Sequence, residues 1–173
     1  MKNGCLRAFC ALLGVLAAAS LAQQKDGATL VRVGQPVPAF EAGTMDGKTF
    51  RMQDIKGKTV LLNFFATWCP SCKAELPELQ KQVWERFQAR GLVLLAIGRE
   101  HSEKELERFR KENGYTFDFA PDPKREIFKL FATQNIPRNV LVGKDGTVAY
   151  HGVGYEPEEF RSLIASIDKA LNP

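Results

Sequence analysis

Two nearly unbroken apolar runs lie in the middle of the chain, at 60–66 and 92–97. Runs of this length are typical of strands that are buried on both faces of a parallel sheet. Between them, hydrophobic residues recur every three or four positions, which predicts a helix over 71–90 with one buried face: Leu76, Leu79, Val83 and Phe87. The segment is therefore expected to form a right-handed β-α-β unit.

Two Asp-Gly pairs predict β-hairpins on either side of this unit, because Asp-Gly favours the tight turns that join antiparallel strands. Each pair separates two short segments of strand-like composition. These segments are 37–42 and 49–52 around Asp46-Gly47, and 140–142 and 148–151 around Asp145-Gly146.

Three further helices are predicted from their start signals. Ser102 and Glu105 have the spacing of a capping box, which opens a helix to about residue 112. Pro123, directly after Asp122, opens a second helix to about residue 133, and Pro157 opens a third to about residue 171. The order ββ-β-α-β-α-α-β-β-α predicts an α/β fold in which helices flank a central mixed sheet.

The N-terminal segment has the pattern of a secretion signal. Lys2 and Arg7 supply positive charge before an apolar stretch at 8–19, and Ser20-Leu21-Ala22 resembles a cleavage site before Gln23. The longer segment 6–22 has 17 residues, with Arg7 near its start, and is at the lower limit of a membrane span, so a retained anchor is the alternative. We expect the protein to be exported to the periplasm or another extracytoplasmic space.

The chain then divides into three parts. Residues 1–22 are the signal peptide or membrane anchor, 23–33 are a flexible lead-in, and 34–173 form one domain of sufficient length for a real core. Two of the four cysteines, Cys5 and Cys10, leave with the signal. The remaining pair, Cys69 and Cys72, is too sparse for a disulfide-stabilised scaffold and indicates a redox centre.

The pentapeptide Trp68-Cys69-Pro70-Ser71-Cys72 lies where the first buried strand meets the predicted helix. The unpaired N–H groups and the dipole of a helix N-terminus favour a negative charge. Cys69 is therefore expected to be stabilised as a thiolate, the form that attacks disulfides. Cys72, one turn later, is placed to close a disulfide with it.

Charge and histidine content exclude other classes of function. The formal net charge of +4 falls to +2 once Lys2 and Arg7 are removed with the signal. A charge this small does not indicate a nucleic-acid-binding protein. His101 and His151 do not have a zinc-ligand spacing with the two cysteines and are expected to be structural or surface residues. We expect no metal and no cofactor.

Four stretches resemble the TlpA/ResA-like thiol-disulfide oxidoreductases of the thioredoxin superfamily over residues 33–171. The most specific is 57–77, which contains the Cys pair; the others are 34–40, Ile136-Pro137 and Lys144-Asp145-Gly146. The resemblance implies a thioredoxin fold with an N-terminal β-hairpin and a helical insertion.

The resemblance also implies roles for individual residues. Cys69 is similar to the exposed attacking cysteine, Cys72 to the buried resolving cysteine, and Pro137 to a cis-proline that faces the pair. Trp68 is expected either to shape the docking surface or to pack in the core. The implied substrate-binding residues are Trp68, Pro70, Ile136 and Pro137.

Glu75 is the candidate for proton transfer. It follows Cys72 by three positions, so the two side chains can share a helix face. It resembles the active-site glutamate of the ResA-like group and would take the proton of Cys72 as a general base. Many thioredoxins hold a buried acid at the position of Asn63, which cannot titrate. The alternative is a solvated surface acid. Pro77 is expected to kink the helix.

We therefore expect an extracytoplasmic enzyme that reduces protein disulfides, with Cys69, Cys72 and Glu75 as catalytic residues. The resemblance implies a membrane thiol-transfer protein as electron donor, a role in cytochrome c maturation, and a monomer that contacts membrane only if the N-terminal segment is retained. A peroxiredoxin-type peroxidase is the first alternative, although Thr67 lies two residues before Cys69 instead of three. A copper carrier is the second, although its Cys spacing is one residue longer.

Overall fold

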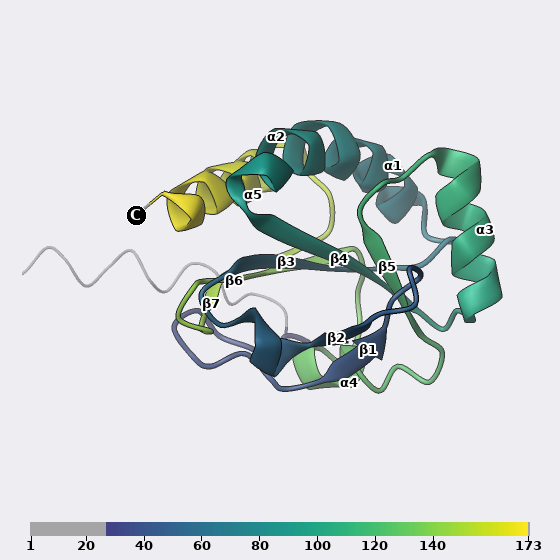
Figure 1. The fold of residues 1–173 in the computed structure, drawn as a ribbon, viewed down its shortest axis with the longest axis horizontal. Helices are drawn as coiled ribbons and strands as arrows, with labels where there is room; N and C mark the ends of the chain where they lie inside the picture. Colours follow the sequence, from purple (N-terminus) through teal and green to yellow (C-terminus); the bar gives the residue numbers. More distant parts are fainter. Residues whose placement is uncertain (1–26, 173) are drawn as a thin grey trace, which may run out of the picture.

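The computed structural model describes residues 27–172 and centres on a five-stranded sheet of order β5-β4-β3-β6-β7 (Figure 1). β3 pairs in parallel with β4, and β4 with β5, whereas the β3–β6 and β6–β7 pairs are antiparallel. The mixed sheet is therefore confirmed. Its strands are β3 (Thr59–Phe65), β4 (Leu92–Arg99), β5 (Asp118–Asp122), β6 (Arg138–Val142) and β7 (Val148–Val153).

Helices cover both faces of this sheet, as Figure 1 shows. α1, α2 and α5 lie over one face, and the short α4 lies over the other beside the N-terminal hairpin β1–β2. α3 stands near β5 at the edge of the sheet. The bounds are β1 (Glu41–Gly43), β2 (Thr49–Arg51), α1 (Pro70–Glu78), α2 (Glu85–Phe87), α3 (Glu103–Asn113), α4 (Phe128–Phe131) and α5 (Pro157–Leu171), with the 3-10 turn η1 (Met52–Ile55) after β2.

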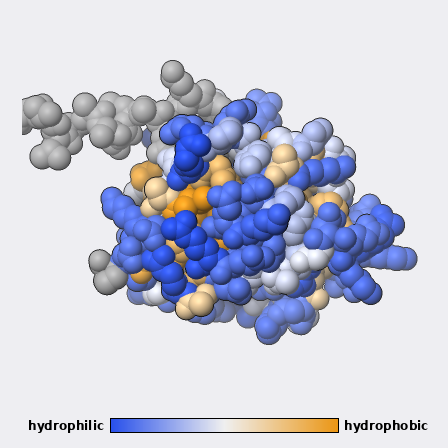
Figure 2. Space-filling view, turned by 90° about the horizontal axis from the view of Figure 1, so that it is seen from above, coloured by the Kyte–Doolittle hydropathy of each residue, from blue (hydrophilic) through white to orange (hydrophobic). Residues whose placement is uncertain are grey.

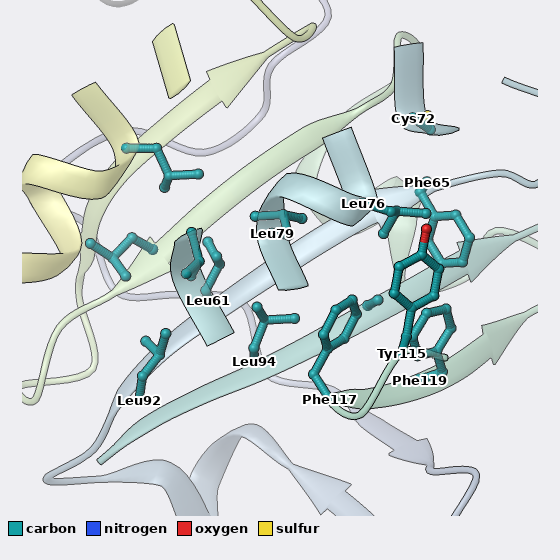
Figure 3. Close-up of a cluster of buried hydrophobic side chains, with 14 of the residues drawn as sticks. Leu61, Phe65, Cys72, Leu76, Leu79, Leu92, Leu94, Tyr115, Phe117 and Phe119 are labelled. Atoms are coloured by element: carbon teal, nitrogen blue, oxygen red, sulfur yellow. The ribbon is translucent and has the colours of Figure 1, made fainter. Parts of the chain in front are cut away.

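Alternation along the central strand divides the core into two layers. All seven residues of β3 are buried. Leu61 and Phe65 belong to the layer under the helices α1 and α5, shown in Figure 3, whereas Leu62 and Phe64 belong to the layer on the opposite face. Each fully buried side chain of this size contributes about 1.5–3 kcal/mol to folding. The outer surface on the side of α1, α2 and α5 is mostly hydrophilic (Figure 2).

Most of the local signals in the sequence are confirmed. Ser102 and Glu105 form both hydrogen bonds of the capping box at the start of α3. The Asp46-Gly47 and Asp145-Gly146 turns join β1 to β2 and β6 to β7. α5 begins at Pro157 as predicted. These signals succeed because each depends on hydrogen bonds or backbone angles within a few residues.

The long helix predicted over 71–90 is divided into four segments. α1 passes into the π-helical η2 (Leu79–Trp84), which is followed by α2 and the 3-10 turn η3 (Gln88–Arg90). Pro77 has no N–H to donate, so the regular α pattern loses one hydrogen bond just before the change. The helix ends at Gly91, whose φ of 91° is left-handed, as the sequence predicted.

The predicted helix over 123–133 is wrong, and a strand was missed before it. β5 extends the parallel part of the sheet, and only the four residues of α4 are helical. Arg125 has a φ of 60°, a left-handed angle that interrupts a right-handed helix. Asp122 does act at a helix start, but its carboxylate accepts from the N–H groups of Ile127 and Phe128, at 3.2 and 2.8 Å.

This cap leads to a stability prediction. Asp122→Ala removes a buried acceptor from two N–H groups, so we expect the free energy of unfolding to fall by about 1–3 kcal/mol. Asp122→Asn keeps one acceptor oxygen and should lose less. Urea unfolding of both variants measures the difference. Equal stability of Asp122→Ala and the wild type would contradict the assigned cap.

The described part of the predicted lead-in, residues 27–33, is packed against the domain, which differs from the flexible segment that we expected over 23–33. Ala28 and Val31 are buried, and the N–H of Leu30 donates to the carbonyl of Phe131 at 2.9 Å. Burial of two apolar side chains and this hydrogen bond hold the segment against α4. The predicted signal or anchor at 1–22 lies outside the described residues. Within 27–172, no helix is both long and apolar enough to cross a membrane.

Candidate active site

Cys69 is the N-cap residue of α1 and forms a disulfide with Cys72. Its Sγ atom accepts a hydrogen bond from the N–H of Cys72 at 3.2 Å. This contact belongs to the set of unpaired N–H groups at the helix N-terminus, which favour negative charge. On reduction, the same N–H points at the sulfur that must become a thiolate.

Two further groups surround the sulfur of Cys69. The hydroxyl of Ser71 lies 3.4 Å away and can donate to it. The carbonyl oxygen of Ile136 lies 3.9 Å away, from the loop that precedes β6. The peptide bond between Ile136 and Pro137 is cis, which confirms that prediction. The loop and the helix thus meet at the Cys pair.

Exposure separates the residues of the pentapeptide. Trp68 is 57% exposed, which excludes the alternative that it packs in the core. The guanidinium of Arg99 lies 5.6 Å from the centre of its ring. Cys69 is 4% exposed, so it is much less open than we expected for an attacking cysteine. Cys72 is fully buried and lies at one end of the hydrophobic cluster in Figure 3.

Glu75 is buried beneath the Cys pair's helix and is not a solvated surface acid, since only 1% of it is exposed. Its two carboxylate oxygens accept one hydrogen bond each. Asn63 donates at 2.9 Å and Asn139 at 2.6 Å. Asn63 also donates to the side-chain oxygen of Asn139 at 2.9 Å. The three side chains form one closed polar cluster inside an apolar layer.

Burial raises the pKa of Glu75 from 4.5 to about 7, because the charged carboxylate loses its hydration. The hydrogen bonds from Asn139 and Asn63 lower the pKa and offset part of this effect. Near neutral pH the group therefore exists in both protonation states. A carboxyl group with this property is suited to accept and return a proton.

Strand register explains why these polar groups meet. Asn63 of β3 lies directly opposite Asn139 of β6, and Asn139 lies opposite Gly152 of β7. Paired residues point to the same face of the sheet. The row passes under α1, whose Glu75 completes the cluster. Asn139 was missed by sequence reasoning, since only a known register could have indicated it.

Two more residues that position the site were missed in the sequence. His101 is buried, as expected of a structural residue, but its Nε2 accepts from the N–H of Thr67 at 2.9 Å, two residues before Cys69. Burial lowers the pKa of His101, which keeps this nitrogen free to accept. Arg138 is also buried and donates to the carbonyls of Gln134 and Asn135, in the loop before Pro137.

Within residues 27–172, no group of three or more His, Cys, Asp or Glu side chains is arranged to hold a metal ion. The chemistry of the described site is that of a dithiol/disulfide pair with a buried carboxyl group. Such a site can exchange two electrons and a proton with another thiol or disulfide.

Residues 33–151 of the chain match the AhpC/TSA family. The thiol-disulfide oxidoreductase ResA of Bacillus subtilis is 30% identical over 122 residues, which cover 70% of this chain and 68% of that protein. ResA of Bacillus thuringiensis is 27% identical over 129 residues, with coverage of 75% and 74%. A solved structure of a candidate protein disulfide isomerase from Bacteroides thetaiotaomicron is 32% identical, with a TM-score of 0.80 over 84% of this chain and 94% of that one.

Proposed function

The chain belongs to the AhpC/TSA family and to the ResA-like thiol-disulfide oxidoreductases, and from this premise we propose that it reduces disulfides of exported proteins. The observation that carries the proposal is the position of the Cys69 sulfur, which accepts a hydrogen bond from the N–H of Cys72 in the first turn of α1. The Cys69 thiolate attacks one sulfur of the substrate disulfide, and the other substrate sulfur leaves as a thiolate.

Resolution follows from the second cysteine. Cys72 gives its proton to the carboxylate of Glu75, and the Cys72 thiolate then attacks the sulfur of Cys69. The Cys69–Cys72 disulfide forms and the second substrate sulfur leaves. Two electrons pass from the dithiol to the substrate. Trp68, Pro70, Ile136 and Pro137 border the pair and are proposed to contact the substrate chain.

The buried carboxylate supports the reducing direction. A negative charge at Glu75, one helical turn from Cys72, disfavours a thiolate beside it. Oxidants of this superfamily depend on a stabilised reduced form. A site that disfavours the thiolate favours the disulfide product instead, so the dithiol gives up electrons more readily.

Location and partners form part of the same proposal. The signal-like segment at 1–22 supports export, with the domain either released or tethered to the membrane. An exported reductant needs a source of electrons, and we propose a membrane thiol-transfer protein. Apocytochrome c cysteines are the proposed client, and the working unit is a monomer.

The reduction potential of the Cys69–Cys72 pair tests this function. A value near the thioredoxin figure of about −270 mV is expected, whereas one near the DsbA figure of about −120 mV would make the protein an oxidant. Reduction of a disulfide-bonded protein and consumption of peroxide should be measured on the same sample. Peroxide consumption without disulfide reduction would replace the proposal by a peroxidase.

A further inference from the structure

Glu75 needs a route by which its proton reaches solvent, if it acts as the base described above. The carboxyl group is buried, and the substrate would cover the Cys side of α1 during reaction. The inference below therefore rests on the proposed function. It concerns the opposite side of Glu75, where α1, β6, β7 and α5 meet.

A small cavity lies on that side, with about 10 Å³ of room for the centre of a water molecule. This is close to the smallest space that holds one water. The lining includes the polar residues Glu75, Asn139, Tyr150, Tyr155 and Glu159. Glu159 is exposed on α5. The cavity is thus lined both by the buried Glu75 and by a glutamate at the surface.

The hydroxyl of Tyr150 holds Glu159 at this cavity. It donates to the Glu159 carboxylate at 3.2 Å and lies 3.3 Å from the Glu159 carbonyl oxygen. Gly152 makes room for the hydroxyl, since a Cβ atom there would lie 2.6 Å from the Tyr150 oxygen. A side chain at this position of β7 would therefore displace the hydroxyl of Tyr150.

We propose that this cavity is the proton path of Glu75, in which one water links Glu75 to Glu159 and Tyr150 positions the accepting carboxylate. The O–H bond of protonated Glu75 breaks and its proton passes to the water. The water gives one of its own protons to the Glu159 carboxylate, which releases it to solvent. No electrons move. Glu75 is then ionised and ready to accept the proton of Cys72.

The other titratable groups around the path are few among the described residues. Tyr155 lines the cavity, and burial raises its pKa. The negative charge of Glu78 on α1 raises the pKa of Tyr155 further. Burial is the largest cause of the raised pKa of Tyr150, and the negative charges of Glu159 and Glu75 raise this pKa further. Tyr150 therefore stays protonated and serves as a donor. Asn63 and Asn139 bind Glu75 without titrating.

The test uses an aromatic disulfide that releases a coloured thiolate in two phases. Cys69 releases the first thiolate and Cys72 the second. Glu75 must lose a proton before the second phase at about pH 6, but it is already ionised at about pH 8. Because solvent can partly replace a lost relay group, we expect Glu159→Gln to slow the second phase about 10-fold at the lower pH only.

Tyr150→Phe should have the same pH-dependent effect, and a small imidazole buffer should restore the rate of Glu159→Gln. Glu158→Gln is the matched control and should leave both phases unchanged. Glu158 is an exposed acid on the same helical turn as Glu159, but it forms an ion pair with Arg161. Equal rates of Glu159→Gln and wild type at both pH values would overturn the path. So would equal slowing at both, which would indicate a structural defect. Slowing by Glu75→Gln in either case would leave the proposed function intact.

Discussion

Replacing Cys69 by serine is expected to abolish disulfide reduction, with a loss of about 1,000-fold or more. Serine retains the shape and the hydrogen bond from the N–H of Cys72 at this N-cap. It cannot form a thiolate at neutral pH, so the attack on the substrate sulfur fails. The rate of reduction of a disulfide-bonded protein measures the effect directly.

Cys72→Ser is the matched variant, because it removes the resolving step and keeps the attack. Cys69 should then form a stable mixed disulfide with the substrate, visible as an adduct in the intact mass. Cys69→Ser should form none. If Cys69→Ser were to keep its activity, or if Cys69→Ser formed the adduct on Cys72 while Cys72→Ser formed none, the order of attack would be wrong.

Local signals in the sequence predicted the elements that carry the site. The apolar run of β3 and the start of α1 placed the Cys pair at a helix N-terminus, and both follow from short-range patterns. β5 and α4 were not predicted correctly. The left-handed angle at Arg125 and the distant reach of the Asp122 carboxylate override the helix signal of Pro123. Such contacts across five or six residues have no fixed sequence pattern.

In the candidate site too, the sequence indicated the residues that are close together in the chain and missed those that come from other strands. Cys69, Cys72 and Glu75 lie on two successive turns of the helix, so their spacing indicated that Cys72 and Glu75 can share a helix face. The role of Glu75 as the base came from the resemblance to the ResA-like group and stays a prediction. Asn139 comes from another strand 64 residues beyond Glu75 and meets it only through the register of β6 against β3. Tyr150 lies on β7, the next strand of the sheet, and its place beside Asn139 likewise depends on how β7 pairs with β6. Polar groups contributed by neighbouring strands need the folded sheet to be identified.

The Asn63–Asn139 cluster has a functional consequence of its own. Two amide donors stabilise the ionised carboxylate of Glu75, while burial opposes ionisation. An apolar pair in their place would raise the pKa further and keep the group protonated at neutral pH. A cationic partner would lower it and remove its power to accept a proton. Neutral amides therefore hold Glu75 in the range where it can exchange protons.

Glu75→Gln is expected to change both the thiol titration and the stability profile. Without the neighbouring carboxylate, the apparent pKa of the thiol pair should fall, and exchange should slow because the base is lost. Thiolate absorbance against pH and the two-phase assay measure these effects. The exposed acid Glu112 offers a control, because Glu112→Gln should alter neither quantity.

The stability of the oxidised protein gives an independent result, since its cysteines are in the disulfide. The pKa of Glu75 is about 7 in the folded state against 4.5 when exposed. Below pH 4.5 both states hold the proton; as the pH rises to 7, the unfolded state releases it first, so stability falls. This loss is about 3 kcal/mol and then stays constant. In urea titrations, the stability of Glu75→Gln relative to wild type should therefore increase by that amount across the window. A constant difference would mean that the pKa of Glu75 is the same in the folded and unfolded states, which would contradict the raised pKa.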